Sequence, residues 1–170
     1  MRLTNLLSST LLCAFIACTT NVSAAQSGGS SAHKSFCKLV AHRGGSKLGA
    51  ENRTETFDEA MRQVQYLDAI ELDIHPSSDG ELMVIHDETL DRTHGQPGTV
   101  CQMSSQQLRD AGVPTLRQVL QQTSGHCQLF IEIKVPHKRE LQPHYQGLEE
   151  TLVWLLQETF VQPQPVVISF

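Results

Sequence analysis

The stretch IELDIHPSSDGELMVIHDETLDRT, residues 70–93, alternates charged and aliphatic side chains in its first half. Glu71 and Asp73 occupy two alternate positions, and isoleucine or leucine fills the positions around them. Successive side chains of a β-strand point to opposite faces of the sheet, so this alternation predicts a strand over residues 69–75. One face of that strand is apolar and the other presents two carboxylates, whose charge needs compensation inside a protein.

Short apolar segments alternate with helical patterns along the rest of the chain, which is typical of an α/β fold with a parallel sheet. The connection at Asp79-Gly80 is too short for a helical crossover. It predicts either a hairpin, in which Asp73 faces His86, or an irregular loop between two short parallel strands. We expect the other strands at residues 36–41, 82–86, 128–135 and 165–170.

Three helices are expected between these strands. The first begins at Thr56, which forms a capping box with Glu59. The second begins at residues 114–116, and the third runs from Leu148 to Phe160. The pattern shows no internal repeat and no second folded domain.

The strand expected at residues 128–135 repeats the charged alternation, with Glu132 and Lys134 on one face. In α/β folds the helices cover the apolar face, so the charged faces point inward, near the strand ends where ligands bind. Three carboxylates from two strands make an all-oxygen site suited to Mg²⁺ or Ca²⁺: Glu71, Asp73 and Glu132. The alternative is that Glu71 and Glu132 are structural ion-pair partners of Lys134 and Arg43.

Residues 41–45 read AHRGG and follow the first expected strand. His42 lies at a strand end, where catalytic groups gather in barrels, and Arg43 offers planar donors that match phosphate oxygens. His86 brings a second imidazole to another strand end. Two imidazoles provide the base and the acid that phosphodiester cleavage requires. Asp87 either orients His86 or is a turn residue.

These motifs together resemble, in order and spacing, the glycerophosphodiester phosphodiesterase family of PLC-like phosphodiesterases. The resemblance rests on HRGG, on EN at residues 51–52, on residues 70–93, and on PTL and IEIK, and it covers about residues 39–170. It implies a TIM-type (β/α) barrel. Such barrels take about 250 residues, so the resemblance predicts a barrel truncated after the fifth strand.

The resemblance also implies roles for individual residues. The metal ligands are Glu71, Asp73 and Glu132, for Ca²⁺ or Mg²⁺; the acid–base pair is His42 and His86; the phosphate-binding groups are Arg43 and Lys134. The implied reaction releases an alcohol and sn-glycerol 3-phosphate from a glycerophosphodiester. Two alternatives stay open: a related phospholipase of the lysophospholipase D or phosphoinositide-cleaving type, and a catalytically inactive truncated fragment.

Several other residues carry weaker expectations. His75 shares the face of Asp73, so it is expected near the site. Arg53 stands where the family usually has Thr or Ser and is expected to alter the loop after the first strand. Arg92 is given no role. The remaining loop histidines are expected to be solvated: His94, His126, His137 and His144.

The N-terminal residues predict export. A basic start, an apolar run and the small residues before Ala24 indicate a secretory signal peptide over residues 1–24, followed by a flexible leader over 25–35 and a single domain over 36–170. The expected location is secreted or periplasmic, with no transmembrane segment. The alternative is a lipoprotein anchored through Cys18.

The net charge of −5, without a cluster of lysines and arginines, argues against a nucleic-acid partner. The expected partner is a small glycerophosphodiester, and the oligomeric state is left open. One disulfide is possible among the three cysteines that follow the signal peptide, Cys37, Cys101 and Cys127.

Overall fold

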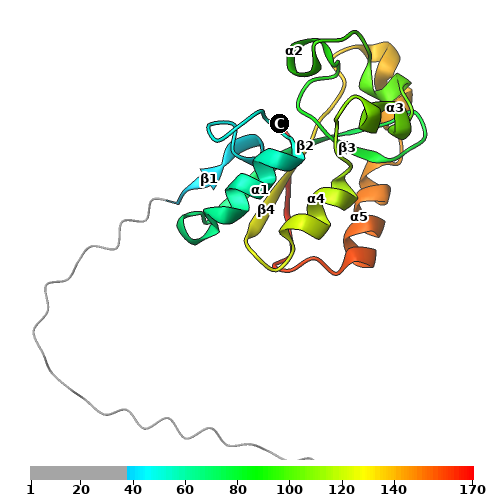
Figure 1. Ribbon diagram of the computed structural model, residues 1–170. Helices are drawn as coiled ribbons and strands as arrows, with labels where there is room; N and C mark the ends of the chain where they lie inside the picture. The colour runs from blue at the N-terminus through cyan, green and yellow to red at the C-terminus, as the bar shows by residue number, and fades with distance from the viewer. Residues whose placement is uncertain (1–37) are drawn as a thin grey trace, which may run out of the picture. The chain divides into compact units, whose positions relative to one another are not determined.

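The computed structural model describes residues 38–170 (Figure 1). The expectations for the signal peptide, the leader, Cys18, Cys37 and the first residues of the first strand lie outside the described residues. Within the described part, no helix has both the length and the apolar composition needed to cross a membrane.

Five strands form one sheet in the described part of the chain: β1 Val40–Ala41, β2 Ala69–Pro76, β3 Leu82–Val84, β4 Gln128–Ile133 and β5 Val166–Ile168. Four of them are parallel, in the order β1-β2-β4-β5, and β3 pairs antiparallel with β2. The predicted α/β class and parallel sheet are therefore confirmed.

The connection between β2 and β3 is a hairpin, which decides between the two alternatives. Its register differs by one residue from the expected one. Ile74 pairs with Val84, and the N–H of Ile85 donates to the carbonyl of Asp73 at 3.0 Å. Asp73 therefore lies opposite Ile85 rather than His86, because the turn holds one residue fewer than a symmetric hairpin centred on Asp79-Gly80 requires.

Three longer helices lie beside the sheet (Figure 1): α1 Thr54–Arg62, α4 Leu116–Thr123 and α5 Leu148–Thr159. Within residues 38–170, two shorter helices and four 3₁₀ segments accompany them: α2 Asp91–His94, α3 Ser105–Asp110, η1 His42–Gly44, η2 Val64–Tyr66, η3 Val100–Gln102 and η4 Arg139–Tyr145.

The apolar face of β2 packs against these helices, as the alternation predicts. Ile70, Leu72 and Ile74 are fully buried. They belong to one cluster with Phe57 of α1 and Leu120 of α4. Each such side chain contributes roughly 1.5–3 kcal/mol through burial. The packing fixes which face of β2 turns away from the helices, and that is the face with the carboxylates.

The start of α1 was predicted wrongly. The helix begins at Thr54, and Thr56 lies inside its first turn without capping it. The hydroxyl of Thr56 instead donates to the carbonyl of Ala50 at 2.6 Å, and so holds the preceding loop. Asn52, with φ of 53°, turns the chain into the helix two residues earlier than expected.

A second lobe, which the sequence patterns did not predict, is formed by residues 85–113. It contains α2, η3 and α3 around a small core that also includes Met83 of β3. The lobe's own residues in this core are Ile85, Leu90, Val100, Leu108 and Val113. Cys101 of this lobe and Cys127 beside β4 are free and buried. A disulfide between these two cysteines is therefore excluded.

Candidate active site

Three carboxylates from two neighbouring strands converge at one place: Glu71 and Asp73 on β2, and Glu132 on β4. Asp73 and Glu132 are paired in register on the parallel strands. One carboxylate oxygen from each residue lies within 4.8 Å of the others. Asp73 is fully buried, Glu71 is buried, and Glu132 is half-buried. The structure thus brings together the three predicted ligands, here called the carboxylate cluster.

The charge of the carboxylate cluster is only partly compensated. The ammonium of Lys134 lies 2.6 Å from Glu132 Oε1 and 3.0 Å from Asp73 Oδ1. Glu71 receives one hydrogen bond, of 2.7 Å, from the backbone N–H of Arg43, while its Oε1 atom is buried without a partner. Burial, together with the charges of Asp73 and Glu132, raises the pKa of Glu71 to about 7.

The ion-pair alternative therefore holds for Glu132 with Lys134 but not for Glu71. The guanidinium of Arg43 donates to Glu51 at 3.0 Å instead. A single ammonium facing three carboxylates leaves an excess of negative charge in a buried place, and buried polar atoms without partners are rare. The unpaired oxygen of Glu71, in a donor set made of oxygen atoms, fits a hard divalent cation.

Asn52 supports this cluster and was not predicted to do so. Its side-chain amide donates to Asp73 Oδ2 at 2.9 Å, and its backbone N–H donates to the carbonyl of Arg43 at 2.9 Å. Asn52 is buried, and its side-chain oxygen has no partner. The motif EN carried the signal, but only the fold shows that its asparagine reaches β2.

The loop after β1 turns tightly to present Arg43. Arg43 adopts a left-handed conformation with φ of 53°, and Gly44 and Gly45 follow with φ of 74° and 104°. A Cβ atom on Gly44 would lie 2.9 Å from the ring of Phe57. This position therefore requires glycine both for its φ and for the close approach to α1. The turn directs the N–H of Arg43 at Glu71.

The two predicted histidines lie at the ends of two strands. His42 follows β1, and its Nε2 atom lies 3.7 Å from Glu71 Oε2 with most of the ring exposed. His86 follows β3, next to Ile85, whose N–H donates to the carbonyl of Asp73. The Nδ1 atom of His86 lies 2.8 Å from Asp87 Oδ1, so Asp87 orients the ring and is more than a turn residue.

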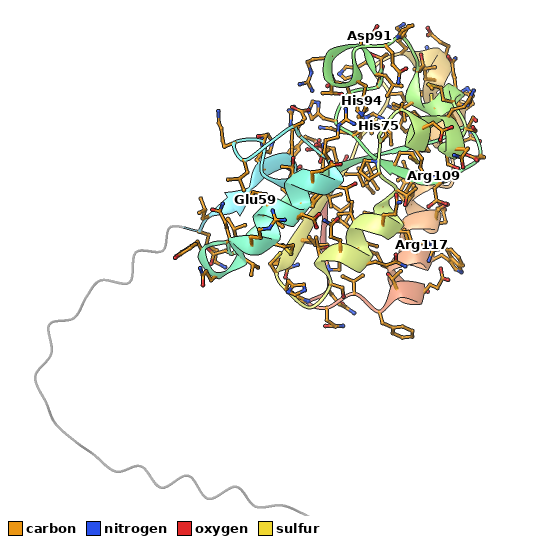
Figure 2. The ribbon with its side chains drawn as sticks, in the orientation of Figure 1. Glu59, His75, Asp91, His94, Arg109 and Arg117 are labelled. Carbon is orange, nitrogen blue, oxygen red and sulfur yellow. The ribbon has the colours of Figure 1, made fainter. Side chains whose placement is uncertain are left out.

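His75 lies in the interior beside the site (Figure 2) and supports the backbone of His86. Its Nε2 atom is 3.0 Å from the carbonyl oxygen of His86, and its Nδ1 atom is 2.5 Å from the hydroxyl of Tyr145. A carbonyl only accepts, so Nε2 carries the proton and Nδ1 accepts from Tyr145. Burial lowers the pKa of His75 to about 4, which keeps the ring neutral.

One further expectation needs correction, and Arg53 makes contacts that were not predicted. His94 is not solvated: its ring is half-buried, its Nδ1 atom lies 2.7 Å from the Thr93 hydroxyl, and burial lowers its pKa to about 4. Arg53 does not reach the carboxylate cluster. Its guanidinium donates to the carbonyls of Gly112 and Thr93, and so fastens the start of α1 to the second lobe.

Arg92, for which the sequence predicts no role, makes four side-chain hydrogen bonds at the rim of the site. Its guanidinium donates to both oxygens of Asp87 and to both oxygens of Glu51. These hydrogen bonds lower the pKa of Asp87 to about 2 and also lower the pKa of Glu51. The contact with Glu51 spans 41 residues, so no local pattern could reveal it.

Comparisons with known proteins agree with this geometry. Residues 42–169 match the model of the glycerophosphoryl diester phosphodiesterase family. The chain is 33% identical over 145 residues to a glycerophosphodiester phosphodiesterase of Caldanaerobacter subterraneus, covering 78% of this chain and 57% of that protein. It is 34% identical over 140 residues to one of Bacillus subtilis, covering 70% of this chain and 45% of the relative. The chain thus spans about half the length of these relatives.

Solved structures show the same fold. The crystal structure of glycerophosphodiester phosphodiesterase from Agrobacterium tumefaciens superposes with a TM-score of 0.64 at 32% identity, over 78% of this chain and 57% of that one. The enzyme of Thermotoga maritima superposes with a TM-score of 0.62 at 26% identity, over 79% and 54%. They confirm the predicted TIM-type (β/α) barrel class. This chain contributes four parallel strands and their helices rather than the five expected barrel strands, because β3 pairs antiparallel with β2.

Proposed function

The chain belongs to the glycerophosphoryl diester phosphodiesterase family, and from that membership we propose that its site hydrolyses glycerophosphodiesters to an alcohol and sn-glycerol 3-phosphate with a divalent cation, Ca²⁺ or Mg²⁺. One observation carries the proposal. Three carboxylates converge, with a buried oxygen left unpaired, beside a histidine at the end of β1 and near a second histidine that follows β3.

The carboxylate cluster would hold the cation, through Glu71, Asp73 and Glu132. A bound divalent cation supplies charge stabilisation for the phosphoryl oxygens and lowers the pKa of an oxygen nucleophile. Asn52 keeps Asp73 in place by its 2.9 Å hydrogen bond. The N–H of Arg43 does the same for Glu71, so two of the three carboxylates are oriented by the loop that follows β1.

Two positively charged side chains, Arg43 and Lys134, would bind the phosphate group of the substrate. Arg43 offers a planar guanidinium whose Nε atom is buried without a partner, and a phosphate oxygen is a suitable acceptor for it. Lys134 contacts two of the carboxylates and adds positive charge at the same place. Both side chains stabilise the charge that develops on the phosphoryl oxygens during the reaction.

The two imidazoles transfer protons. One takes a proton from the attacking oxygen and the other gives a proton to the leaving alcohol. His42 lies beside Glu71, on the side of the cluster formed by the loop after β1. His86 has its Nδ1 atom directed at Asp87, which leaves Nε2 as the nitrogen for proton transfer. The site therefore contains an acid, a base and groups that bind phosphate.

The experiment that tests this proposal measures release of glycerol 3-phosphate from glycerophosphocholine by the full chain, with Ca²⁺ or Mg²⁺ present. His42→Ala and His86→Ala should each lower turnover by about 100-fold or more, since general acid–base catalysis contributes about 10²–10⁴-fold. His126→Ala, on a loop histidine away from these contacts, is the control and should retain full turnover.

Circular dichroism establishes that each variant is folded. Full turnover by both folded histidine variants would contradict the proposed mechanism. A second arm with lysophosphatidylcholine separates the related phospholipase, which would cleave this lipid faster than glycerophosphocholine. A folded chain that cleaves neither substrate would support the inactive alternative.

A further inference from the structure

Arg92 connects the two parts of the site that carry the histidines. It lies on α2, in the second lobe, and its guanidinium contacts two carboxylates at once. The Nε and Nη2 atoms donate to Asp87 at 2.6 and 2.9 Å. The Nη1 and Nη2 atoms donate to Glu51 at 3.0 and 2.6 Å. Both contacts have the two-point geometry that arginine, and not lysine, forms with a carboxylate.

The contact with Asp87 acts on His86. Asp87 Oδ1 lies 2.8 Å from Nδ1 of His86 and also accepts from Arg92, while Asp87 Oδ2 accepts from Arg92 alone. Because an ionised carboxylate only accepts, Nδ1 of His86 must carry a proton, and in the neutral ring Nε2 is then bare. Arg92 keeps Asp87 ionised and fixes the plane of its carboxylate.

The contact with Glu51 acts on Arg43, in the loop that follows β1. Glu51 Oε1 accepts from Arg92 and also from Nη1 of Arg43, at 3.0 Å. A continuous chain of hydrogen bonds therefore runs from Arg43 through Glu51, Arg92 and Asp87 to His86. The guanidinium of Arg92 thus joins the loop after β1 to the segment after β3 at the rim of the site.

We propose that Arg92 is a positioning residue, which holds His86 in the Nδ1–H tautomer through Asp87 and orients Arg43 through Glu51. The inference rests on the proposed function for its catalytic consequence, since Nε2 of His86 is then the nitrogen that transfers the proton. It does not rest on that function for the tautomer, which is a property of the resting protein.

Arg92 orients the side chains of the site and contributes little to the stability of the fold. The side chain of Arg92 is 52% exposed, and exposed ion pairs contribute little to folding. A carboxylate that orients a catalytic or metal-bound imidazole typically affects activity by about 10- to 100-fold. Replacing Arg92 should therefore leave the fold intact and change the state of the His86 ring.

The test is nitrogen NMR of the full chain labelled with ¹⁵N-histidine, at a pH high enough that the ring signals of His86 no longer change with pH, so that the neutral ring is observed. His86→Gln assigns the ring signals by their disappearance. The wild-type chain should show His86 with Nδ1 protonated and Nε2 bare. In Arg92→Gln both signals should move toward the values of a mixture of tautomers. Arg62→Gln removes another exposed arginine, paired with Glu59 on α1, and should change neither signal.

Asp87→Ala gives a second prediction. It removes the carboxylate that accepts from Nδ1 of His86 and from Arg92, so both ring signals of His86 should again move toward the values of a mixture of tautomers. His86 signals in Arg92→Gln and Asp87→Ala identical to those of the wild type would overturn the proposal.

Kinetics add a separate readout. If the chain turns over glycerophosphocholine, kcat of Arg92→Gln should fall by about 10- to 100-fold, while Arg62→Gln should retain the wild-type value. An unchanged kcat in Arg92→Gln would contradict the catalytic consequence. Absence of turnover in the wild type would count against the proposed function alone, because the tautomer measurement needs no substrate.

Discussion

Individual residues of the site divide into those that a local pattern reveals and those that only the fold reveals. Glu71, Asp73 and Glu132 were identified because the two-residue period of a strand places charged residues on one face. Their convergence within 4.8 Å follows from the pairing of β2 with β4. The contact of Asn52 with Asp73 and that of Arg92 with Glu51 could not be predicted, because the two partners lie 21 and 41 residues apart in the sequence.

Glu71 makes the stability of the metal-free chain depend on pH. Its pKa is about 7 in the folded chain, against an ordinary value of 4.5, because the carboxyl is buried beside Asp73 and Glu132. Between these values the folded state binds more protons than the unfolded state. The free energy of unfolding should therefore fall as pH rises from 4.5 to 7, by up to about 3 kcal/mol.

Urea unfolding in chelator, at pH 5.5 and at pH 8, measures this change. Glu71→Gln has no titrating group at this position, so its stability should decline less over the same interval. An equal decline in the unfolding free energy of the wild type and of Glu71→Gln would show that the pH dependence does not come from Glu71. The same pKa predicts that binding of Ca²⁺ below pH 7 releases a proton.

Gly44 offers a sharper test of how the loop after β1 is built. An alanine there would combine a φ of 74° with a Cβ atom 2.9 Å from Phe57, so the ring or the loop must move. Gly44→Ala should cost about 2–4 kcal/mol of unfolding free energy and weaken cation binding, since the turn aims the N–H of Arg43 at Glu71.

The matched control is Gly80→Ala. Gly80 has a φ of 82° but open space around it, so the substitution adds backbone strain alone, about 1 kcal/mol. Thermal unfolding compares the two variants with the wild type. A loss in Gly44→Ala no greater than that in Gly80→Ala would show that the contact with Phe57 does not matter.

At the scale of the elements, apolar periodicity located the three longer helices and β2 and β4 to within about two residues. Local capping chemistry was less reliable. The Thr56–Glu59 pattern matches a capping box, yet the left-handed Asn52 starts α1 earlier and Thr56 bonds the loop instead. The capping boxes in the structure begin at Ser104 and Thr115. In both of them the residue three positions later is glutamine, so the glutamate expected in a capping box is missing from the sequence.

The capping box of α4 should be measurable by substitution. The hydroxyl of Thr115 accepts from the N–H of Gln118, and the Gln118 side chain accepts from the N–H of Thr115. Thr115→Ala should lower the free energy of unfolding by about 1 kcal/mol. Thr151→Ala removes an exposed hydroxyl that bonds within the first turn of α5 and should change stability by less than about 0.5 kcal/mol.

Urea denaturation followed by far-ultraviolet circular dichroism gives both values. If Thr115→Ala unfolded at the same urea concentration as the wild type, the cap would contribute nothing to α4.

At the scale of the whole molecule, the parallel sheet explains why distant motifs meet. The path β1-β2-β4-β5 places the carboxyl ends of β1, β2 and β4 side by side, and the β2–β3 hairpin adds His86 to the same region. The succession of strands and helices along the chain was predictable from the sequence, but the antiparallel place of β3 in the sheet was left open. The second lobe was not, because its helices have four and six residues, too short to show a helical period.

The most direct test of the central claim, that the carboxylate cluster binds a cation needed for turnover, is one titration. Release of glycerol 3-phosphate from glycerophosphocholine is measured as free Mg²⁺ or Ca²⁺ is raised from zero in chelator. The rate should rise from near zero to saturation in the wild type, and Glu132→Gln should need at least about ten-fold more cation. A wild-type rate in chelator equal to that at saturating cation would contradict the claim.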